Sequence, residues 1–248
     1  MTTPRCSPGD PVSFRRREVI AGENGDLHRY YLCLLEALGP QGWWPAETRL
    51  EVILGAILTQ NTTWRNAASA IARLRETGAL DLERLRTIGP GRLQSLIRPA
   101  GFFRRKSRAI RGFLRWLDET HQGSLDRMFA RPAEHLRADM LRIKGLGPET
   151  VDAILLYAGG KPFFVADAYT RRVLGRHGIL THDAGYGEAQ RTIHQRLERD
   201  AGIYSEFHAL LVEVGKHYCR SQEARCGGCP LEIFLPDGKP PEQTQRES

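Results

Sequence analysis

Apolar side chains recur at three- and four-residue spacings along most of the chain, a pattern that predicts amphipathic helices. The pattern covers residues 27–38, 49–60, 64–76, 108–119, 132–143, 149–160, 188–199 and 204–218. Gly, Pro and Asp residues separate these segments as caps and short turns. Strand-like alternation is nearly absent, and the one extended stretch we expect is 161–167 (KPFFVAD). The sequence therefore predicts an all-α protein of about ten helices.

The two ends of the chain lack this periodicity. Residues 1–24 are polar and Pro-rich, and residues 236–248 (PDGKPPEQTQRES) are polar throughout. We expect a flexible arm and a flexible tail there. The N-terminal region contains no apolar stretch that resembles a signal peptide. No apolar run approaches the roughly 20 residues needed to cross a bilayer, so we expect a cytoplasmic protein that does not contact a membrane.

Charge and cysteine content narrow the choice of partners. The chain has 36 Lys and Arg residues against 29 Asp and Glu residues, a formal net charge of +7. This excess favours a polyanionic partner, most commonly nucleic acid. The five cysteines are odd in number, which argues against a disulfide framework. Cys219, Cys226 and Cys229 lie close together near the C-terminus and indicate ligands of a metal or cluster.

The segment 141–150 (LRIKGLGPET) joins two helical patterns through a short turn that contains two glycines. Glycine tolerates a positive φ, and the proline that follows suits the first position of a helix. Such a turn aims several backbone N–H groups in one direction, where a phosphate can bind. A glycine-capped corner between two helices is the structural alternative. The residues expected to contact DNA here are Lys144, Gly145, Leu146, Gly147 and Thr150, with Leu146 also anchoring the turn in the core.

The segment 164–173 (FVADAYTRRV) follows the turn and places Asp167 before another helix, where it could be a plain N-cap. Read with KGLGPET, it resembles the helix-hairpin-helix DNA glycosylases of the endonuclease III type. The resemblance covers residues 27–230 and includes LGAILTQNT and the stretch 101–110 (GFFRRKSRAI). It implies that Asp167 is the catalytic carboxylate and that Gln60 inserts into DNA. The expected reaction is excision of a flipped, damaged base during base excision repair.

One position bears on the type of reaction. In the bifunctional members of this family, a lysine two residues after the second hairpin glycine forms a Schiff base and cleaves the strand. Glu149 stands at that position here. A carboxylate cannot form an imine, so the resemblance implies a monofunctional glycosylase without AP-lyase activity. Asp167 would stabilise the oxocarbenium character of the sugar and orient or deprotonate the attacking water.

Tryptophans gather around the segment that contains Gln60. Trp43 and Trp44 precede it with Pro45, and Trp64 follows it. This arrangement resembles the 3-methyladenine glycosylases of the endonuclease III type. It implies that Trp44 and Trp64 sandwich an alkylated purine, with Trp43 and Pro45 lining the pocket and Glu149 attracting a cationic base. Core packing is the alternative for each tryptophan. Excision of oxidised pyrimidines is the alternative reaction.

The cysteine spacing Cys219-x6-Cys226-x2-Cys229 matches the first three ligands of the [4Fe–4S] loop of endonuclease III. The family's fourth cysteine is replaced here by Leu235. Three thiolates can still hold a cluster whose fourth iron takes another ligand, for which Asp237 is a candidate. A Cys3His zinc site that includes His217 is a second possibility. The third is that the cysteines are the remnant of a lost site.

Basic residues offer further contacts to phosphate. They are Arg104, Arg105, Lys106, Arg108, Arg111 and Arg115, with Arg171, Arg172 and Arg176 after Asp167. Arg104 and Lys106 are the first candidates among them. The resemblance implies two lobes, a central one from 49 to 158 and a second from 25 to 48 with 159 to 235, and an active site in the cleft between them. We expect a monomer that acts on double-stranded DNA. A non-catalytic DNA-damage-binding protein and a metal-dependent interaction protein remain as alternatives.

Overall fold

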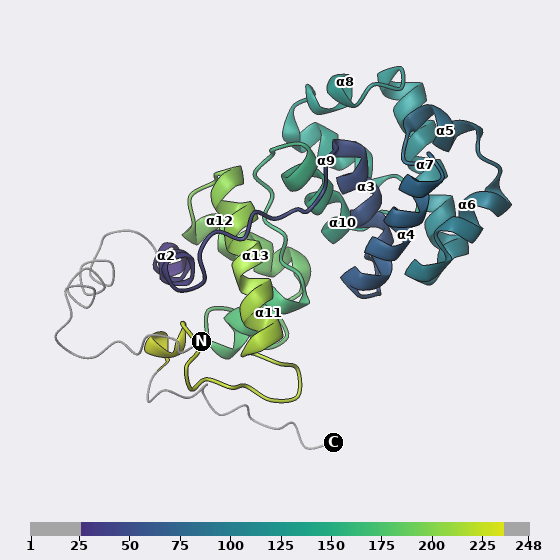
Figure 1. Cartoon of the computed structure of the whole chain (residues 1–248). Coiled ribbons are helices and arrows are strands. Elements are labelled where there is room, and N and C mark those ends of the chain that lie inside the picture. Colours follow the sequence, from purple (N-terminus) through teal and green to yellow (C-terminus); the bar gives the residue numbers. More distant parts are fainter. Residues whose placement is uncertain (1–25, 236–248) are drawn as a thin grey trace. The chain divides into compact units, whose positions relative to one another are not determined.

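The computed structural model describes residues 26–235, so the expected arm (1–24) and tail (236–248) lie outside the described residues. Within residues 26–235 there are twelve α-helices and no strand (Figure 1). The only β-pairing in that range is an isolated bridge between Cys219 and Ala224. The predicted all-α class is confirmed. The stretch 161–167 contains no regular element and pairs with no strand.

The chain divides into two compact units. One is the continuous segment Trp44–Val165, which we call the hairpin unit. The other combines Met1–Trp43 with Ala166–Ser248, and we call it the split unit. The described part of the split unit is 26–43 and 166–235. No helix in the described part of the chain is long and apolar enough to span a membrane.

The hairpin unit is built around one helix that is buried on nearly all sides. Helix α3 (Arg49–Leu58) is buried from Leu50 to Leu58, as its almost uninterrupted apolar sequence requires. The other elements of the unit are α4 (Trp64–Glu76), α5 (Leu82–Thr87), α6 (Pro90–Leu96), the 3₁₀ turn η1 (Arg98–Ala100), α7 (Phe103–His121), α8 (Leu125–Phe129), α9 (Ala133–Leu141), α10 (Pro148–Ala153) and the π-helical turn η2 (Ile154–Ala158). Of these, α4, α7, α10 and η2 pack against α3.

Side-chain caps fix where several of these helices begin. The Thr48 hydroxyl accepts a hydrogen bond from the Glu51 amide at the start of α3, and Thr63 caps α4 in the same way. Asp81 and Ser124 cap α5 and α8. Each cap satisfies an N–H group that the helix leaves without a partner and is worth about 1 kcal/mol. The starts of these four helices are therefore set locally by the sequence.

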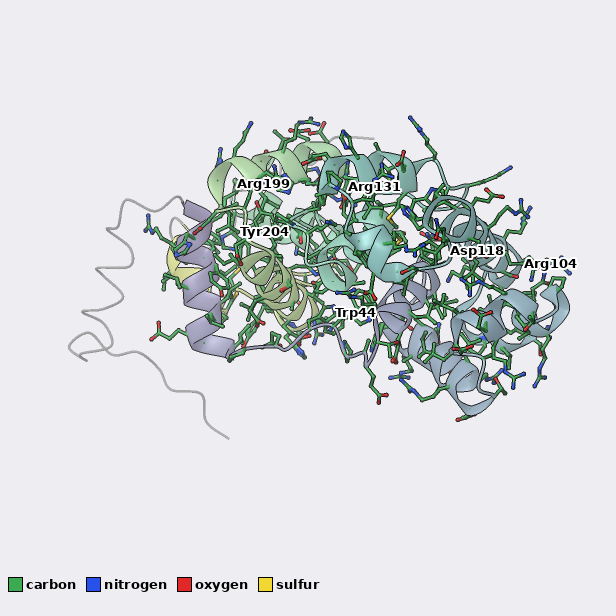
Figure 2. The ribbon with its side chains drawn as sticks, turned by 90° about the horizontal axis from the view of Figure 1, so that it is seen from above. Trp44, Arg104, Asp118, Arg131, Arg199 and Tyr204 are labelled. Carbon is green, nitrogen blue, oxygen red and sulfur yellow. The ribbon has the colours of Figure 1, made fainter. Side chains whose placement is uncertain are left out.

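The split unit has a long central helix, α13 (Ala201–His217), which packs against α11 (Ala168–Arg176) and α2 (Asp26–Leu38). Helix α12 (Tyr186–Arg196) also packs on α2, and a 3₁₀ turn, η3 (Glu232–Phe234), follows the cysteine loop. Tyr204 of α13 is fully buried within this unit (Figure 2). Gly215 allows α13 to approach α11 closely, because a Cβ there would overlap the ring of Tyr169.

Candidate functional site

The turn between α9 and α10 exposes its backbone and hides its apolar side chain. Gly145 has φ +98°, a conformation that favours glycine, and a Cβ there would come within 3.0 Å of Ala109 Cβ. Gly147 is exposed and precedes Pro148, which holds the first position of α10 as predicted. Leu146 is 5% exposed and anchors the turn, also as predicted. The exposed residues Gly147, Pro148 and Glu149 therefore leave the start of α10 open to an anion.

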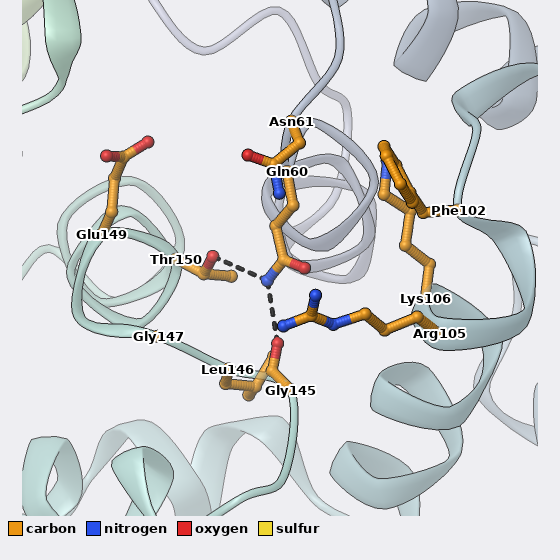
Figure 3. A pocket seen from close by; sticks show the side chains of 10 residues that line it. All are labelled: Gln60, Asn61, Phe102, Arg105, Lys106, Gly145, Leu146, Gly147, Glu149 and Thr150. Carbon is orange, nitrogen blue, oxygen red and sulfur yellow. Dashed lines mark hydrogen bonds between the residues drawn. The ribbon is translucent and has the colours of Figure 1, made fainter.

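Gln60 clamps this turn from the end of α3. Its Nε2 donates hydrogen bonds to the carbonyl of Gly145 and to Thr150 Oγ1, both at 2.9 Å (Figure 3). The carboxamide therefore joins the start of the turn to the first turn of α10. Thr150 is 7% exposed and its hydroxyl accepts the hydrogen bond from Gln60, while contact of Thr150 with DNA stays a prediction. Insertion of Gln60 into DNA stays a prediction.

A cavity of about 400 Å³ lies beside the turn. Its lining residues are Gln60, Asn61, Phe102, Arg105, Lys106, Gly145, Leu146, Gly147, Glu149 and Thr150 (Figure 3). Phe102 is a residue that the sequence reasoning missed. Its side chain is 64% exposed, and its φ of +44° is uncommon for a bulky residue. An exposed aromatic ring on a strained backbone beside a cavity is typical of a binding residue. Its signal in the sequence is the aromatic pair at 102–103, where the basic helix α7 begins.

Lys106 was predicted to contact DNA, and the structure corrects this. The side chain is 1% exposed, and Nζ donates hydrogen bonds to the carbonyls of Leu58 at 2.8 Å and Ala100 at 2.7 Å. These carbonyls end α3 and η1, where a cation is favoured. Burial lowers the pKa of Lys106 to about 8. Arg104 and Arg105, by contrast, are exposed on the first turn of α7.

Trp44, Trp64 and Tyr157 form an aromatic group in the hairpin unit. The ring centroids of Trp44 and Trp64 are 5.3 Å apart with an interplanar angle of 87°, and those of Trp44 and Tyr157 are 5.2 Å apart at 59°. Gly55 makes room for this group, since a Cβ there would lie 3.1 Å from Trp44 Cζ2. A base between two parallel rings needs about 7 Å between them, twice a normal contact distance. Trp44 and Trp64 are thus brought together edge to face, an arrangement that leaves no slot for a base between them.

The other predicted pocket residues lie in different surroundings. Trp43 belongs to the split unit, where Lys216 Nζ is 5.6 Å from its ring centroid. Pro45 is exposed next to Trp44. Glu149 is exposed in the first turn of α10 and lines the cavity at the turn. Tyr157, which the sequence reasoning missed, comes from the π-helical turn η2, an element frequent at functional sites.

Asp167 is held at the N-terminus of α11 with both carboxylate oxygens engaged. Oδ1 accepts a hydrogen bond from the amide of Thr170 at 2.8 Å, and Oδ2 lies 3.6 Å from His208 Nε2. Burial by itself raises the pKa of Asp167, but the His208 imidazole and the Thr170 N–H outweigh it, and the pKa lies below its ordinary value. The side chain is 16% exposed. The site therefore holds an ionised carboxylate, and His208, buried on α13, is a second residue that the sequence reasoning missed.

The three clustered cysteines line one cavity of the split unit, together with Leu235, Arg176 and His177. Arg176 Nη1 donates to Cys219 Sγ at 3.3 Å, and Arg172 Nε donates to the Cys219 carbonyl at 2.7 Å. These two arginines of α11 bind the cysteine loop. Arg176 therefore places a positive charge beside one of the three sulfurs.

The donor atoms near the cysteine loop do not suit a single metal ion. Within residues 26–235, no three His, Cys, Asp or Glu side chains are arranged to hold one metal ion. The His217 side chain is 65% exposed, and its Nε2 lies 3.1 Å from Glu213 Oε2. The zinc site that included His217 is therefore corrected, while Asp237 lies outside the described residues. A four-iron cluster needs four ligands, and Cys219, Cys226 and Cys229, which line one cavity, offer three thiols for it.

Comparison with known proteins adds three findings. Residues 54–199 match the family described as HhH-GPD superfamily base excision DNA repair protein. The chain is 40% identical over 210 residues to a Methanocaldococcus jannaschii protein named "Putative DNA repair glycosylase MJ1434", covering 84% of this chain and 94% of that one. It is 28% identical over 183 residues to endonuclease III of Sulfolobus acidocaldarius, covering 73% and 79% of the two chains.

Solved structures agree on the fold. A non-covalent endonuclease III–DNA complex superposes with a TM-score of 0.72 at 20% identity, covering 86% of this chain and 94% of that chain. The H. pylori 3-methyladenine DNA glycosylase MagIII, bound to 1,N6-ethenoadenine, gives a TM-score of 0.63 at 26% identity, covering 82% and 96%.

Proposed function

Because this chain belongs to the HhH-GPD superfamily of base excision DNA repair proteins, as a glycosylase of the endonuclease III family, we propose that it excises an alkylated purine by hydrolysis alone. The observation that carries the hydrolytic part is Glu149, which occupies the position of the Schiff-base lysine. A carboxylate has no nitrogen with which to attack the sugar C1′, so the covalent intermediate that precedes strand cleavage cannot form there.

The proposed mechanism assigns the chemical step to Asp167. As the base departs, positive charge develops on the sugar, and an ionised carboxylate beside it stabilises that charge. The lowered pKa of Asp167 keeps the carboxylate ionised at neutral pH. Water then attacks the sugar, and Asp167 orients it or accepts its proton.

Substrate class follows in this proposal from the aromatic group of Trp44, Trp64 and Tyr157. Alkylation at N3 or N7 makes a purine electron-poor or cationic, and such a base gains more from contact with electron-rich rings than a normal base does. The edge-to-face contact of Trp44 and Trp64 requires one ring to turn before a base can lie flat against both. The 3-methyladenine glycosylase MagIII, similar in fold and 26% identical, supports this substrate class.

DNA contact is proposed for the surface around the hairpin cavity. The exposed amides at the start of α10 would bind a phosphate. Lys144, Arg104 and Arg105 are exposed and would add sequence-independent charge contacts. Phe102 has the exposed, apolar ring expected of a side chain that wedges into the base stack where a nucleotide has been flipped out.

A [4Fe–4S] cluster is proposed for the cysteine loop, with Cys219, Cys226 and Cys229 as ligands. When bound, such a cluster would order the loop rather than take part in base excision. Arg176 would offset part of its negative charge through its contact with Cys219 Sγ.

The test is a panel of duplexes, each with one lesion, scored separately for free base and for strand breaks. The panel includes 3-methyladenine, 7-methylguanine, 1,N6-ethenoadenine, an oxidised pyrimidine and undamaged DNA. We expect release of alkylated purines, with strand breaks only after alkali and no trapping by borohydride. Asp167→Asn is the matched control for a contaminating glycosylase. Strand breaks that keep pace with base release would refute the hydrolytic assignment, and faster release of the oxidised pyrimidine would refute the substrate class. Binding without any base release would identify a damage-binding protein.

A further inference from the structure

A fourth cysteine, far away in the sequence, lies against the cysteine loop. Cys33 is on α2, is 5% exposed, and its Sγ donates to the carbonyl of Pro230 at 3.2 Å. Pro230 directly follows Cys229, and 197 positions separate it from Cys33. Both segments belong to the split unit. Helix α2 therefore presents a buried thiol to the part of the loop that carries the expected ligands.

The geometry of the loop points to the same grouping. Cys219, Cys226 and Cys229 line one cavity, and the Cys33 thiol contacts the carbonyl of the residue that directly follows Cys229. Four thiols from three segments gather in one region: one on α2, one just beyond α13, and two within the loop.

The position at which the family carries its fourth cysteine offers no ligand in this chain. Leu235 is 8% exposed and lines the same cavity as the three clustered cysteines. Its side chain has no donor atom, so it can only fill space. His177 also lines that cavity, but its Nδ1 is 3.1 Å from the Tyr30 hydroxyl. Cys33 is therefore the nearby thiol that is a candidate for the fourth ligand.

We propose that Cys33 supplies the fourth thiolate of the iron–sulfur cluster, in place of the cysteine that Leu235 replaces. This inference rests on the proposed cluster, not on the base-excision activity. On assembly, the Cys33 thiol loses its proton and exchanges its contact with the Pro230 carbonyl for a bond to iron. The cluster then ties α2 to the C-terminal loop, and the link closes a long stretch of chain, as a disulfide would.

The decisive variant is Cys33→Ala, with iron analysis and electron paramagnetic resonance as readouts. Wild-type protein reconstituted with iron and sulfide without oxygen should hold about four irons per chain. Cys33→Ala should hold about three after mild oxidation, with the paramagnetic signal of a three-iron cluster. Cys6→Ser is the matched control, because it removes the fifth cysteine and should leave the four-iron cluster intact. Adding Leu235→Cys to Cys33→Ala should restore four irons, because it returns a thiol to the family's position.

The outcomes separate this inference from the proposals on which it stands. A four-iron cluster in Cys33→Ala, equal to that of the wild type, overturns the role of Cys33 and leaves the cluster proposal standing. A wild-type protein that takes up no iron overturns both, while base release by the same preparation would still support the glycosylase. If Cys33→Ala does not fold, alkylation of the wild type decides. Cys33 should become reactive only after a chelator removes the iron, and equal reactivity with and without iron refutes the assignment.

Discussion

His208 Nε2 lies 3.6 Å from Oδ2 of Asp167, while Oδ1 of the same carboxylate accepts a hydrogen bond from the Thr170 amide. The amide and the imidazole both favour the ionised form, whereas burial opposes it. A capping residue that is also kept ionised meets the requirement for stabilising a cationic sugar.

Replacing Asp167 with Asn removes this charge while preserving the shape of the side chain and its ability to accept the Thr170 hydrogen bond. We expect single-turnover base release to fall by about 100-fold or more, because the stabilisation of the developing positive charge is lost. Binding to lesion-containing duplex, measured by fluorescence anisotropy, should change little. If Asp167→Asn releases base at the wild-type rate, Asp167 is only a helix cap.

His208→Ala should make excision more sensitive to acid. Burial raises the pKa of Asp167, and the imidazole lowers it. The pKa of Asp167 should therefore rise when the imidazole is removed. The acid limb of the single-turnover pH–rate profile should therefore move to higher pH. A lowered carboxylate pKa contributes stability above the ordinary value of 3.8 and loses it as pH falls through the folded-state pKa. The stability difference between wild type and His208→Ala should accordingly shrink in acid.

His194→Ala is the matched control for that experiment. His194 is on α12 of the same unit and stacks on the ring of Tyr204, with centroids 5.4 Å apart. Its removal should reduce stability without moving the acid limb. A profile that shifts equally in both variants would show that His208 acts only through packing.

Lys106→Met should change how stability depends on pH. In the folded chain Lys106 loses its proton near pH 8, whereas its ordinary pKa is 10.5. The unfolded chain therefore binds more protons between these values, and this residue makes the free energy of unfolding rise with pH across that window. Urea unfolding at a series of pH values should show that rise in the wild type relative to Lys106→Met.

Lys144→Met, which removes an exposed lysine, is the control. It should follow the wild-type pH dependence of stability but weaken DNA binding, with the slope of log affinity against log salt reduced by about 0.9. Lys106→Met should keep the wild-type salt slope. The reverse result would restore Lys106 as a DNA contact.

The misplacement of Lys106 shows where sequence reasoning reached its limit. Lys106 stands in a run of arginines, which reads as a solvated basic face. Its spacing from Ile110, Phe113 and Leu117 nevertheless puts it on the buried stripe of α7. The periodicity of α7 was therefore enough to predict that Lys106 is buried. It could not predict which carbonyls accept hydrogen bonds from Nζ, because one of them belongs to α3, whose place against α7 is set by tertiary packing.

Other features of the fold and the site also separate into those that local sequence rules predict and those that depend on tertiary packing. Pro148 at the start of α10 and the burial of Leu146 follow from local rules, and both were predicted correctly. The angle between the Trp44 and Trp64 rings depends on Gly55 and Tyr157, and no local pattern encodes it. The contact of Cys33 with the cysteine loop joins segments near opposite ends of the chain, so a search for nearby ligands cannot find it.

Gln60 and Phe102 line one cavity, but removal of Gln60 should lower stability, whereas removal of Phe102 should lower activity. Gln60→Ala breaks two hydrogen bonds that hold the hairpin turn and should cost about 1 to 2 kcal/mol of unfolding free energy. Phe102→Ala removes a ring that is 64% exposed and should change stability by less than about 0.5 kcal/mol. Excision should nevertheless fall in Phe102→Ala. Thermal unfolding and single-turnover base release separate the two effects. A large stability loss in Phe102→Ala would make its ring a packing residue.

Glu149→Lys tests whether one side chain excludes strand cleavage. The first turn of α10 is fixed by Gly147 and Pro148, and Glu149 is exposed there, so a lysine can replace it without disturbing the core. An amine at this position can attack C1′ as the base leaves and form an imine that borohydride reduces to a stable protein–DNA cross-link. We expect a cross-link with Glu149→Lys but not with the wild type. Glu149→Gln, which removes the charge without adding an amine, should form none. A cross-link with the wild type would mean that another nitrogen reaches the sugar, and the hydrolytic assignment would fall even though Glu149 carries no amine.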